Sequence, residues 1–238
     1  MTMWLRKCVS LALMVASLAL GATLSAEGSD YDRRVSMGLR AAPNQLQLDA
    51  LTALREELGG SLLDSIDEGS GVTRSLFNPV GKLTLPTAGD PLDIALTFAR
   101  DNLSLLGLED GDLDEIEVCD IVYSAISGAT HVYLCQRHEG LDIFNAQLHV
   151  NVSRDGAILS VNNSFVPGLN AIDKERVAAI EADDACMAVA KHLGIQAGRA
   201  RWEGGSLLAT DLSTEPIDPK LLWIPVGRSV KLVLKQAH

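Results

Sequence analysis

The sequence predicts an α+β fold, in which helices pack on one face of an antiparallel sheet. The evidence is two apolar patterns of helical period in the first half of the chain and a run of alternating apolar and polar residues between positions 115 and 165. Apolar spacings of three and four place residues on one face of a helix, whereas alternation places every second residue on one face of a strand. Consecutive short strands pair antiparallel, and we expect the helices to cover one side of them.

Residues 1–26 have the pattern of a secretory signal peptide. Arg6 and Lys7 precede an apolar run from Val9 to Leu20, and small residues follow that run. A run of about twelve apolar residues is too short to cross a bilayer, which needs about twenty. We therefore expect the segment to be removed on export, which leaves a secreted or periplasmic protein without a stable membrane span. An uncleaved anchor is the alternative.

The exported part of the chain is acidic. The whole chain has 20 basic and 31 acidic residues and a formal net charge of −11, and the loss of Arg6 and Lys7 makes it more negative. Proteins that bind nucleic acid present Lys and Arg to the phosphates, so nucleic acid is not an expected partner. Residues 27–44 lack a steady apolar period and predict a flexible leader before the globular part.

Two helices are predicted before the sheet. Between Pro43 and Leu58, leucines recur at spacings of three and four, and two glycines follow. This is the pattern of a helix and its end. The second helix begins with Asp90, which caps the N–H groups of the first turn, and Pro91, which suits that turn. Residues 73–85 alternate loosely around a proline and predict a short hairpin or an extended arm.

Four runs predict the strands of the sheet, and these are 115–125, 130–137, 141–152 and 157–165. The third run alternates most regularly, so one of its faces is expected to be buried and the other wet. The buried face consists of Phe144, Ala146, Leu148, Val150 and Val152, and the wet face of Asn145, Gln147, His149 and Asn151. Asp155-Gly156 predicts a tight hairpin between the third and fourth runs, because glycine supplies a positive φ. The four runs predict an antiparallel meander.

A further helix and a closing hairpin are predicted after the sheet. Residues 182–193 have apolar residues on one helical side and Gly194 as a stop. Residues 221–225 and 229–234 then predict two strands joined around Gly227. We expect Cys186, on the apolar side of the helix, to be an ordinary core residue.

Cys119 and Cys135 are predicted to form a disulfide. If residues 117–125 and 130–137 form a hairpin with a three-residue loop centred on Ser127, the two cysteines lie directly opposite each other. Such a pair is within reach of a disulfide, and export supplies an oxidising compartment. A register slip of one residue would instead leave two reduced thiols.

No catalytic or metal site is expected, and no cofactor. A zinc peptidase of the common type needs His-Glu-x-x-His on a helix, so that two histidines share one face. His138-Glu139 is the one possible start, and Asp142 stands where the second histidine is needed. His131, His138 and His149 could converge on neighbouring strands, but histidines on a polar sheet face ordinarily contact water or hydrogen-bond locally. The chain is therefore not expected to be an enzyme.

Several segments resemble the pro-region of fungalysin-family secreted zinc metallopeptidases. The segments TRSLF, GKLT, DPLDIALTFARDNLSLLGL and EDGDL, in this order, are similar to the fungalysin/thermolysin propeptide (FTP) motif. GATHVY, Gln136, FNAQLHVNV and NNSFVP resemble the body of such propeptides, and LWIPV resembles their end. The similarity extends from Tyr31 to Leu234. It implies cystatin-like lobes, with an FTP-type propeptide lobe over residues 45–115 and a PepSY/cystatin-like lobe over residues 116–238.

The resemblance also implies a function and a partner. A propeptide of this family inhibits a zinc metallopeptidase catalytic domain and assists its folding; here it would act without that domain, as a truncated or stand-alone chain, in cis or in trans. We expect the C-terminal residues to approach the peptidase cleft, namely Lys235, Gln236, Ala237 and His238. The alternative is an exported cystatin-like binding module with a non-peptidase partner. A downstream reading frame that encodes His-Glu-x-x-His would favour the propeptide.

Overall fold

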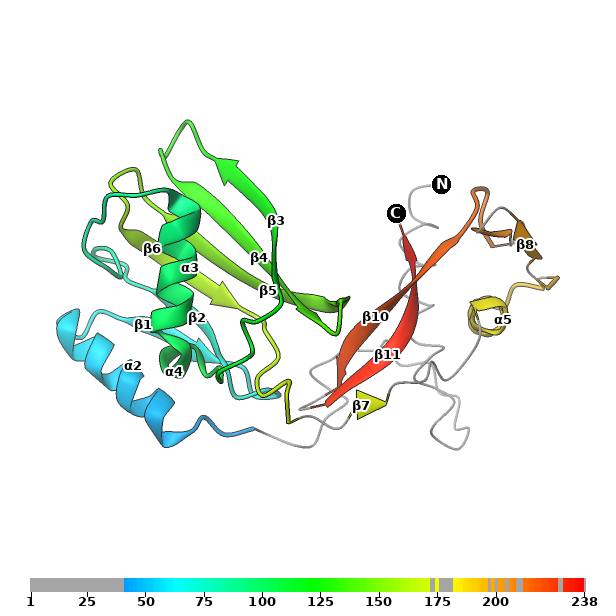
Figure 1. Cartoon of the computed structure of the whole chain (residues 1–238), viewed down its shortest axis with the longest axis horizontal. Helices are drawn as coiled ribbons and strands as arrows, with labels where there is room; N and C mark the ends of the chain where they lie inside the picture. The colour runs from blue at the N-terminus through cyan, green and yellow to red at the C-terminus, as the bar shows by residue number, and fades with distance from the viewer. Residues whose placement is uncertain are drawn as a thin grey trace. The chain divides into compact units, whose positions relative to one another are not determined.

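The chain forms two compact units in the computed structural model, which describes residues 41–171, 174–175, 182–196, 198–199, 201–203, 206–208, 212–226 and 229–237 (Figure 1). One unit comprises Met37–Ile172 with Pro225–Ser229, and the other comprises the rest of the chain. The predicted signal peptide, most of the predicted leader and His238 lie outside the described residues. Within the described ranges, every helix is too short or too polar to span a bilayer.

The first unit contains an antiparallel sheet with the order β1–β2–β6–β5–β4–β3. Its strands are β1 (Leu63–Ile66), β2 (Thr73–Phe77), β3 (Ile116–Tyr123), β4 (Thr130–His138), β5 (Leu141–Val152) and β6 (Ile158–Asn163). The last four strands pair in chain order, which confirms the predicted meander. The predicted α+β class is confirmed as well.

Three helices belong to this unit, namely α2 (Gln45–Glu57), α3 (Pro91–Asp101) and α4 (Leu103–Leu106). The side chain of Asn44 accepts the N–H of Gln47 at 2.8 Å at the start of α2. Asp90 accepts the N–H of Leu92 at 2.9 Å at the start of α3, so the predicted cap is confirmed. Helix α3 packs on β4 and β5, and one face of the sheet is covered in this way (Figure 1).

The core lies between the helices and this face of the sheet. It includes Phe98 and Ala99 from α3 and, from the sheet, Leu76, Val132, Leu134, Ala146, Leu148, Val150, Val152 and Val161. The predicted alternation of β5 is thus confirmed from Ala146 to Val152. It is wrong at Phe144, which is half-buried, whereas Ile143 is buried. A bulge causes the change, because Asn145 has a φ of 55° and the pairing with β4 shifts there.

Gly156 forms the predicted turn between β5 and β6 with a φ of 80°. It also has a second role. A Cβ at this position would lie 1.7 Å from the carbonyl oxygen of Thr87, so the loop before α3 packs directly against this turn.

The predicted arm over residues 73–85 consists of β2 and a return segment, in which Leu83 donates its N–H to Ile158 O at 2.7 Å.

The predicted boundary between residues 115 and 116 falls inside the first unit. Ser75 of β2 is paired with Asn162 of β6, so segments from both sides of that boundary share one sheet. The physical reason is that β1 and β2 by themselves form only a short hairpin, which needs a further strand and a helix to bury an apolar face. The structure divides instead near residue 172.

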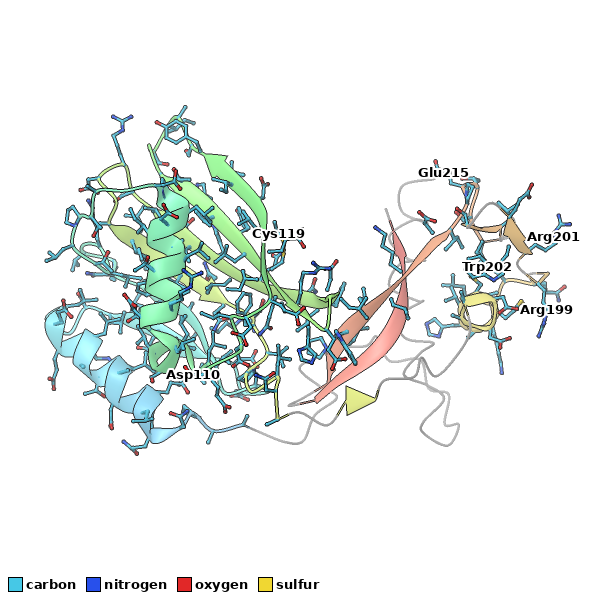
Figure 2. All side chains as sticks on the ribbon, viewed as in Figure 1. Asp110, Cys119, Arg199, Arg201, Trp202 and Glu215 are labelled. Carbon is cyan, nitrogen blue, oxygen red and sulfur yellow. A yellow bond between two sulfur atoms is a disulfide. The ribbon has the colours of Figure 1, made fainter. Side chains whose placement is uncertain are left out.

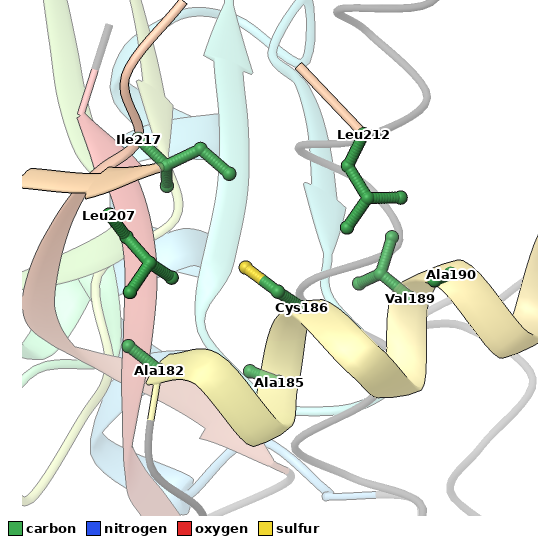
Figure 3. Packing of buried hydrophobic residues seen from close by; sticks show 8 residues of the cluster. All are labelled: Ala182, Ala185, Cys186, Val189, Ala190, Leu207, Leu212 and Ile217. Atoms are coloured by element: carbon green, nitrogen blue, oxygen red, sulfur yellow. The ribbon is translucent and has the colours of Figure 1, made fainter. Parts of the chain in front are cut away.

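The second unit contains α5 (Ala182–His192), β7 (Lys174–Glu175), β8 (Arg201–Glu203), β9 (Ser206–Leu208), β10 (Asp218–Val226) and β11 (Ser229–Ala237). The helix and the β10–β11 pair confirm the predicted helix and closing hairpin. A small core forms against α5 (Figure 3), and it consists of Ala182, Ala185, Cys186, Val189, Ala190, Leu207, Leu212 and Ile217. Burial, with a smaller effect of the charge on Asp183, raises the pKa of the Cys186 thiol to about 11. The predicted core role of Cys186 is confirmed.

Candidate partner-binding surface

The face of the sheet opposite the helices carries polar side chains in register. His131 of β4, Asn151 of β5 and Ser160 of β6 form one row across three strands. Nδ1 of His131 donates to Asn151 Oδ1, and Asn151 Nδ2 donates to Ser160 Oγ at 2.7 Å. Each side chain in this row therefore holds its neighbour in place. We refer to this surface as the open face.

The next row of the open face contains two stacked rings. Tyr133 and His149 are paired in the register, and their rings lie 4.2 Å apart with an angle of 9° between their planes. His131 lies 5.7 Å from His149, measured between ring centroids. Burial lowers the pKa of His149, and a charge on His131 lowers it further. The imidazole of His149 is therefore neutral at neutral pH.

Of the three histidines that could converge on neighbouring strands, only two lie together. His131 and His149 share the open face, whereas His138 is 7% exposed and points to the covered side of the sheet. Glu139 and Gly140 form the turn after His138, with φ values of 51° and 75°, which is the backbone of a two-residue hairpin. Over the described part of the chain, no group of three or more His, Cys, Asp or Glu side chains could hold a metal ion.

Strand β3 is the edge strand beside the open face. Among the described strands it pairs only with β4. Its exposed apolar residues are Val118, Ile121, Val122 and Tyr123, between 41% and 58% exposed, and Ile126 in the following loop is fully exposed. Exposed apolar residues on an unpaired edge are typical of a surface that contacts another chain.

The predicted register of β3 on β4 is wrong. Cys135 is paired with Glu117, Tyr133 is paired with Asp120, and Cys119 lies in a bulge between them. The loop is longer than expected, because it closes with a hydrogen bond of 2.8 Å from Ser124 N to Ala129 O. The longer loop shifts the register by one residue, and the bulge at Cys119 shifts it by one more in the same direction.

The structure nevertheless joins Cys119 and Cys135 in a disulfide, with their Cα atoms 5.8 Å apart. Figure 2 labels Cys119 on β3. The bond thus joins two cysteines that are not directly opposite each other in the register. The bond attaches the middle of the edge strand covalently to β4.

Two buried polar side chains fix the segments on either side of the meander. Asp112 is 2% exposed and accepts three backbone N–H groups, from Glu109 at 2.8 Å and from Gly168 and Leu169 at 2.9 Å. Gln136 is fully buried; its amide donates to Asp112 O and Val166 O, and its Oε1 accepts the N–H of Val166 at 2.7 Å. These bonds position the entry to β3 and the exit from β6 together.

Glu115 ties the start of β3 to the β4–β5 turn. Its carboxylate accepts the N–H groups of Glu139 and Gly140, both at 2.8 Å. The bond from Gly140 is the main cause that lowers the pKa of Glu115, and partial burial opposes it. Arg137 lies 3.0 Å from Asp142 and 3.6 Å from Glu117, which adds two ion pairs at the same place.

The sequence-predicted partner contacts belong to the second unit and not to the unit that carries the open face. Lys235, Gln236 and Ala237 are the last residues of β11, so their backbone is that of a strand and not of a free tail. His238 lies outside the described residues. Sequence reasoning included Gln136 and, within EDGDL, Asp112 in the family resemblance, but it gave Asp112 no role, because its partners Gly168 and Leu169 are distant in sequence.

Comparison with known proteins gives a match over the same part of the chain. Residues 114–165 match the family model described as "Fungalysin/Thermolysin Propeptide Motif", and this range contains β3 to β6. The resemblance inferred from the sequence is thereby confirmed, although the motif was expected over residues 45–115.

The curated relatives share short segments with this chain. "Extracellular metalloproteinase 5" of Arthroderma otae is 46% identical over 46 residues, which are 19% of this chain and 7% of that protein. "Extracellular metalloproteinase 10" of Coccidioides posadasii is 47% identical over 51 residues, which are 21% of this chain and 8% of that protein. "Extracellular metalloproteinase mep" of Aspergillus terreus is 32% identical over 105 residues, which are 42% of this chain and 15% of that protein. The matched segments thus cover a small fraction of each relative.

Proposed function

We propose that the chain is the pro-domain of a fungalysin-like zinc metallopeptidase, because residues 114–165 match the fungalysin/thermolysin propeptide motif. In this role it binds the catalytic domain, inhibits it and assists its folding. The observation that carries the proposal is the match of β3 to β6 to the propeptide motif, together with relatives that are named extracellular metalloproteinases.

The surface of the first unit supports a role in binding. The disulfide, Asp112 and Gln136 hold β3 and the open face rigidly, and a rigid surface loses little conformational entropy when it binds. In the proposed function the chain supplies contacts and no catalytic residue, and the zinc ion belongs to the partner. The partner acts in cis where it is part of the same protein, and in trans where it is not.

The location of the motif in extracellular relatives supports export of this chain as well. We propose that residues 1–26 act as the signal peptide and that the mature protein is secreted or periplasmic. The N-terminal residue of the mature protein, measured by mass spectrometry after expression in a secreting host, tests this point. A mature chain that still begins at Met1 would contradict it.

Inhibition in trans is the direct test of the proposed function. A tethered pro-domain acts at a high effective concentration, whereas a separate chain must bind with the affinity of its own surface. We expect that titration of the purified exported chain into a fungalysin-type peptidase reduces the cleavage of a fluorogenic peptide in a saturable way. The same chain after reduction and heat unfolding is the control. Full peptidase activity at micromolar excess of the folded chain would contradict inhibition.

Assisted folding needs a separate measurement. We expect the denatured catalytic domain to recover more activity when it is refolded with the chain and the chain is then removed by proteolysis. An unrelated acidic protein at the same concentration is the control. A chain that neither inhibits nor assists would instead favour an exported binding module with a non-peptidase partner.

We also propose that the end of the chain approaches the catalytic cleft. Lys235 to Ala237 continue the extended backbone of β11, and peptidases bind their substrates as extended segments. A chain that ends at Leu234 is therefore expected to inhibit more weakly than the full chain. The control is the triple substitution of Lys235, Gln236 and Ala237 by glycine, which keeps the length. Equal inhibition by the truncated and full chains would remove this contact.

A further inference from the structure

We propose that β3 is the docking edge of the first unit, and that its occupant is an extended segment of the metallopeptidase catalytic domain, which adds to the sheet beside β3. The identity of the partner rests on the proposed function, whereas the docking edge rests on the backbone and side chains of β3. The expected segment alternates apolar with polar residues and carries at least one Lys or Arg. Addition of a strand to a free sheet edge is a recurrent way to bind an extended peptide.

The outer edge of β3 presents peptide groups that β4 does not use. Ser124 N donates to Ala129 O, so the peptide groups of Ser124 point toward β4. These groups alternate in direction along an antiparallel strand, so those of Tyr123 and Ile121 point to the other side. Among the described residues no strand lies on that side. An added strand would find at least two outward positions there.

Asp120 stands in for the missing neighbour at this edge. Its Oδ1 accepts the N–H of Ile121 at 2.8 Å, and this is the outward N–H that a neighbouring strand would bond through a carbonyl oxygen. No cation of the described residues pairs with Asp120. When a strand carbonyl takes over the N–H, the carboxylate becomes available to a Lys or Arg of the incoming segment.

The side chains of β3 place an apolar strip next to this edge. Val118, Ile121 and Tyr123 are paired with β4 residues whose side chains face the helices. They are nevertheless 41%, 45% and 58% exposed, because α3 packs mainly on β4 and β5. An incoming strand would cover this strip with its own alternate side chains, and the removal of apolar surface from water would favour binding.

Charge distinguishes a basic partner from a second copy of this chain. The residues from 114 to 120 include four acids and no base. Two of the acids have partners in their own chain, since Glu115 accepts backbone N–H groups and Glu117 lies near Arg137. A second copy would bring the same acids and a net charge of −11 to the edge. A segment with Lys or Arg is the complementary occupant.

Hydrogen exchange of the unmodified protein tests the edge directly. We expect the amides of Ile121 and Tyr123 to exchange more slowly in the complex with the catalytic domain than in the free chain, because an added strand accepts their hydrogens. The amides of β1, at the opposite edge of the sheet, provide the internal control and should not change. Equal exchange at Ile121 and Tyr123 in the free and bound states would overturn the inference.

A matched pair of variants tests the energetic contribution. The double substitution Ile121→Lys and Tyr123→Lys places two charges on β3, and we expect it to weaken binding by about tenfold or more. The control is Leu63→Lys on β1, where Leu63 is 57% exposed; we expect its effect on binding to stay within about twofold. Circular dichroism spectra identify any variant that fails to fold, and the exchange experiment does not depend on the variants.

The outcomes separate this inference from the proposed function. If the unmodified chain inhibits the peptidase and the β3 variant inhibits equally well, the docking edge is wrong and the proposed function stands. If the unmodified chain does not bind the catalytic domain, both are overturned. If sedimentation shows that the free chain forms a dimer that the β3 variant abolishes, the occupant of the edge is a second copy and the assignment to a catalytic domain is wrong.

Discussion

At the scale of single residues, a few polar side chains each connect segments that are far apart in the chain. Asp112 joins the residues before β3 to those after β6, and Gln136 bonds to both of these segments from the middle of β4. A buried acceptor of several N–H groups stabilises the fold mainly because its removal leaves those groups without partners. On the open face, Asn151 connects three neighbouring strands in the same way, through His131 and Ser160.

Substitution of Asp112 by Ala is expected to be strongly destabilising. It leaves three N–H groups without their acceptor, of which that of Leu169 is buried and those of Glu109 and Gly168 are partly buried, and a buried group of this kind costs about 1–3 kcal/mol. We therefore expect the free energy of unfolding, measured by urea denaturation, to fall by about 3 kcal/mol or more. Asp110→Ala, at an exposed position of the same segment, is the control and should change it by less than about 0.5 kcal/mol.

His149 is expected to make the stability depend on pH. Its pKa is lowered in the folded protein from the ordinary value of 6.5, so the unfolded chain takes up a proton first as the pH falls below 6.5. The free energy of unfolding should therefore decrease from pH 6.5 downward until the folded protein is protonated too, and it should not depend on this group above pH 6.5. Urea denaturation at pH 8 and at pH 5 measures the effect.

The variant His149→Gln should lose this part of the pH dependence. His192→Gln, at an exposed position of α5, is the control and should keep it. An unchanged difference between pH 8 and pH 5 in His149→Gln would contradict the assignment.

At the scale of elements, the meander is held together by its turns, its bulge and its disulfide. The loop from Ser124 to Ala129 sets the register of β3 on β4, and Cys119, which lies in the bulge, is bonded to Cys135. Sequence reasoning predicted the strands and the cysteine pair, because alternation and spacing are local properties. It did not predict the register, because one additional loop residue shifts every pair that follows.

The disulfide is expected to be detectable and stabilising. After alkylation without a reductant, the peptides that contain Cys119 and Cys135 should remain linked to each other and should carry no alkyl group. The two cysteines are 16 residues apart, and for a loop of this length the chain-entropy estimate is about 3 kcal/mol. The double substitution of both cysteines by Ser should lower the free energy of unfolding by a similar amount. Alkylation of Cys119 in the native, unreduced protein would contradict the bond.

The two hairpin glycines provide a matched comparison. Gly140 and Gly156 have similar φ values, 75° and 80°, but only Gly156 has backbone atoms where a Cβ would lie. We expect Gly140→Ala to cost about 1–2 kcal/mol, the strain of a left-handed residue. Gly156→Ala should cost more, because Thr87 must move as well. Thermal unfolding of both variants measures the difference, and equal costs would mean that Thr87 moves without resistance.

At the scale of the whole molecule, the elements were more predictable than their grouping. The cap at Asp90 and the alternation of β5 are properties of neighbouring residues, and the sequence predicts them well. The short strand β1 was not predicted, because all of its residues are exposed or half-buried, so that no buried face alternates with a wet one. The division of the chain was also mislocated, since it depends on the pairing of Ser75 with Asn162, which are far apart in sequence.

The pairing of β2 with β6 has a consequence for the order of events during synthesis. Residues 45–115 supply helices and two strands, but the strand that borders β2 ends only at Asn163. While the ribosome is still adding the residues of the meander, the first part of the chain lacks β6, the strand that pairs with β2. Under the export proposed above, this order of synthesis would keep residues 45–115 incompletely folded when they reach the translocation machinery, and passage through a narrow channel requires an unfolded chain.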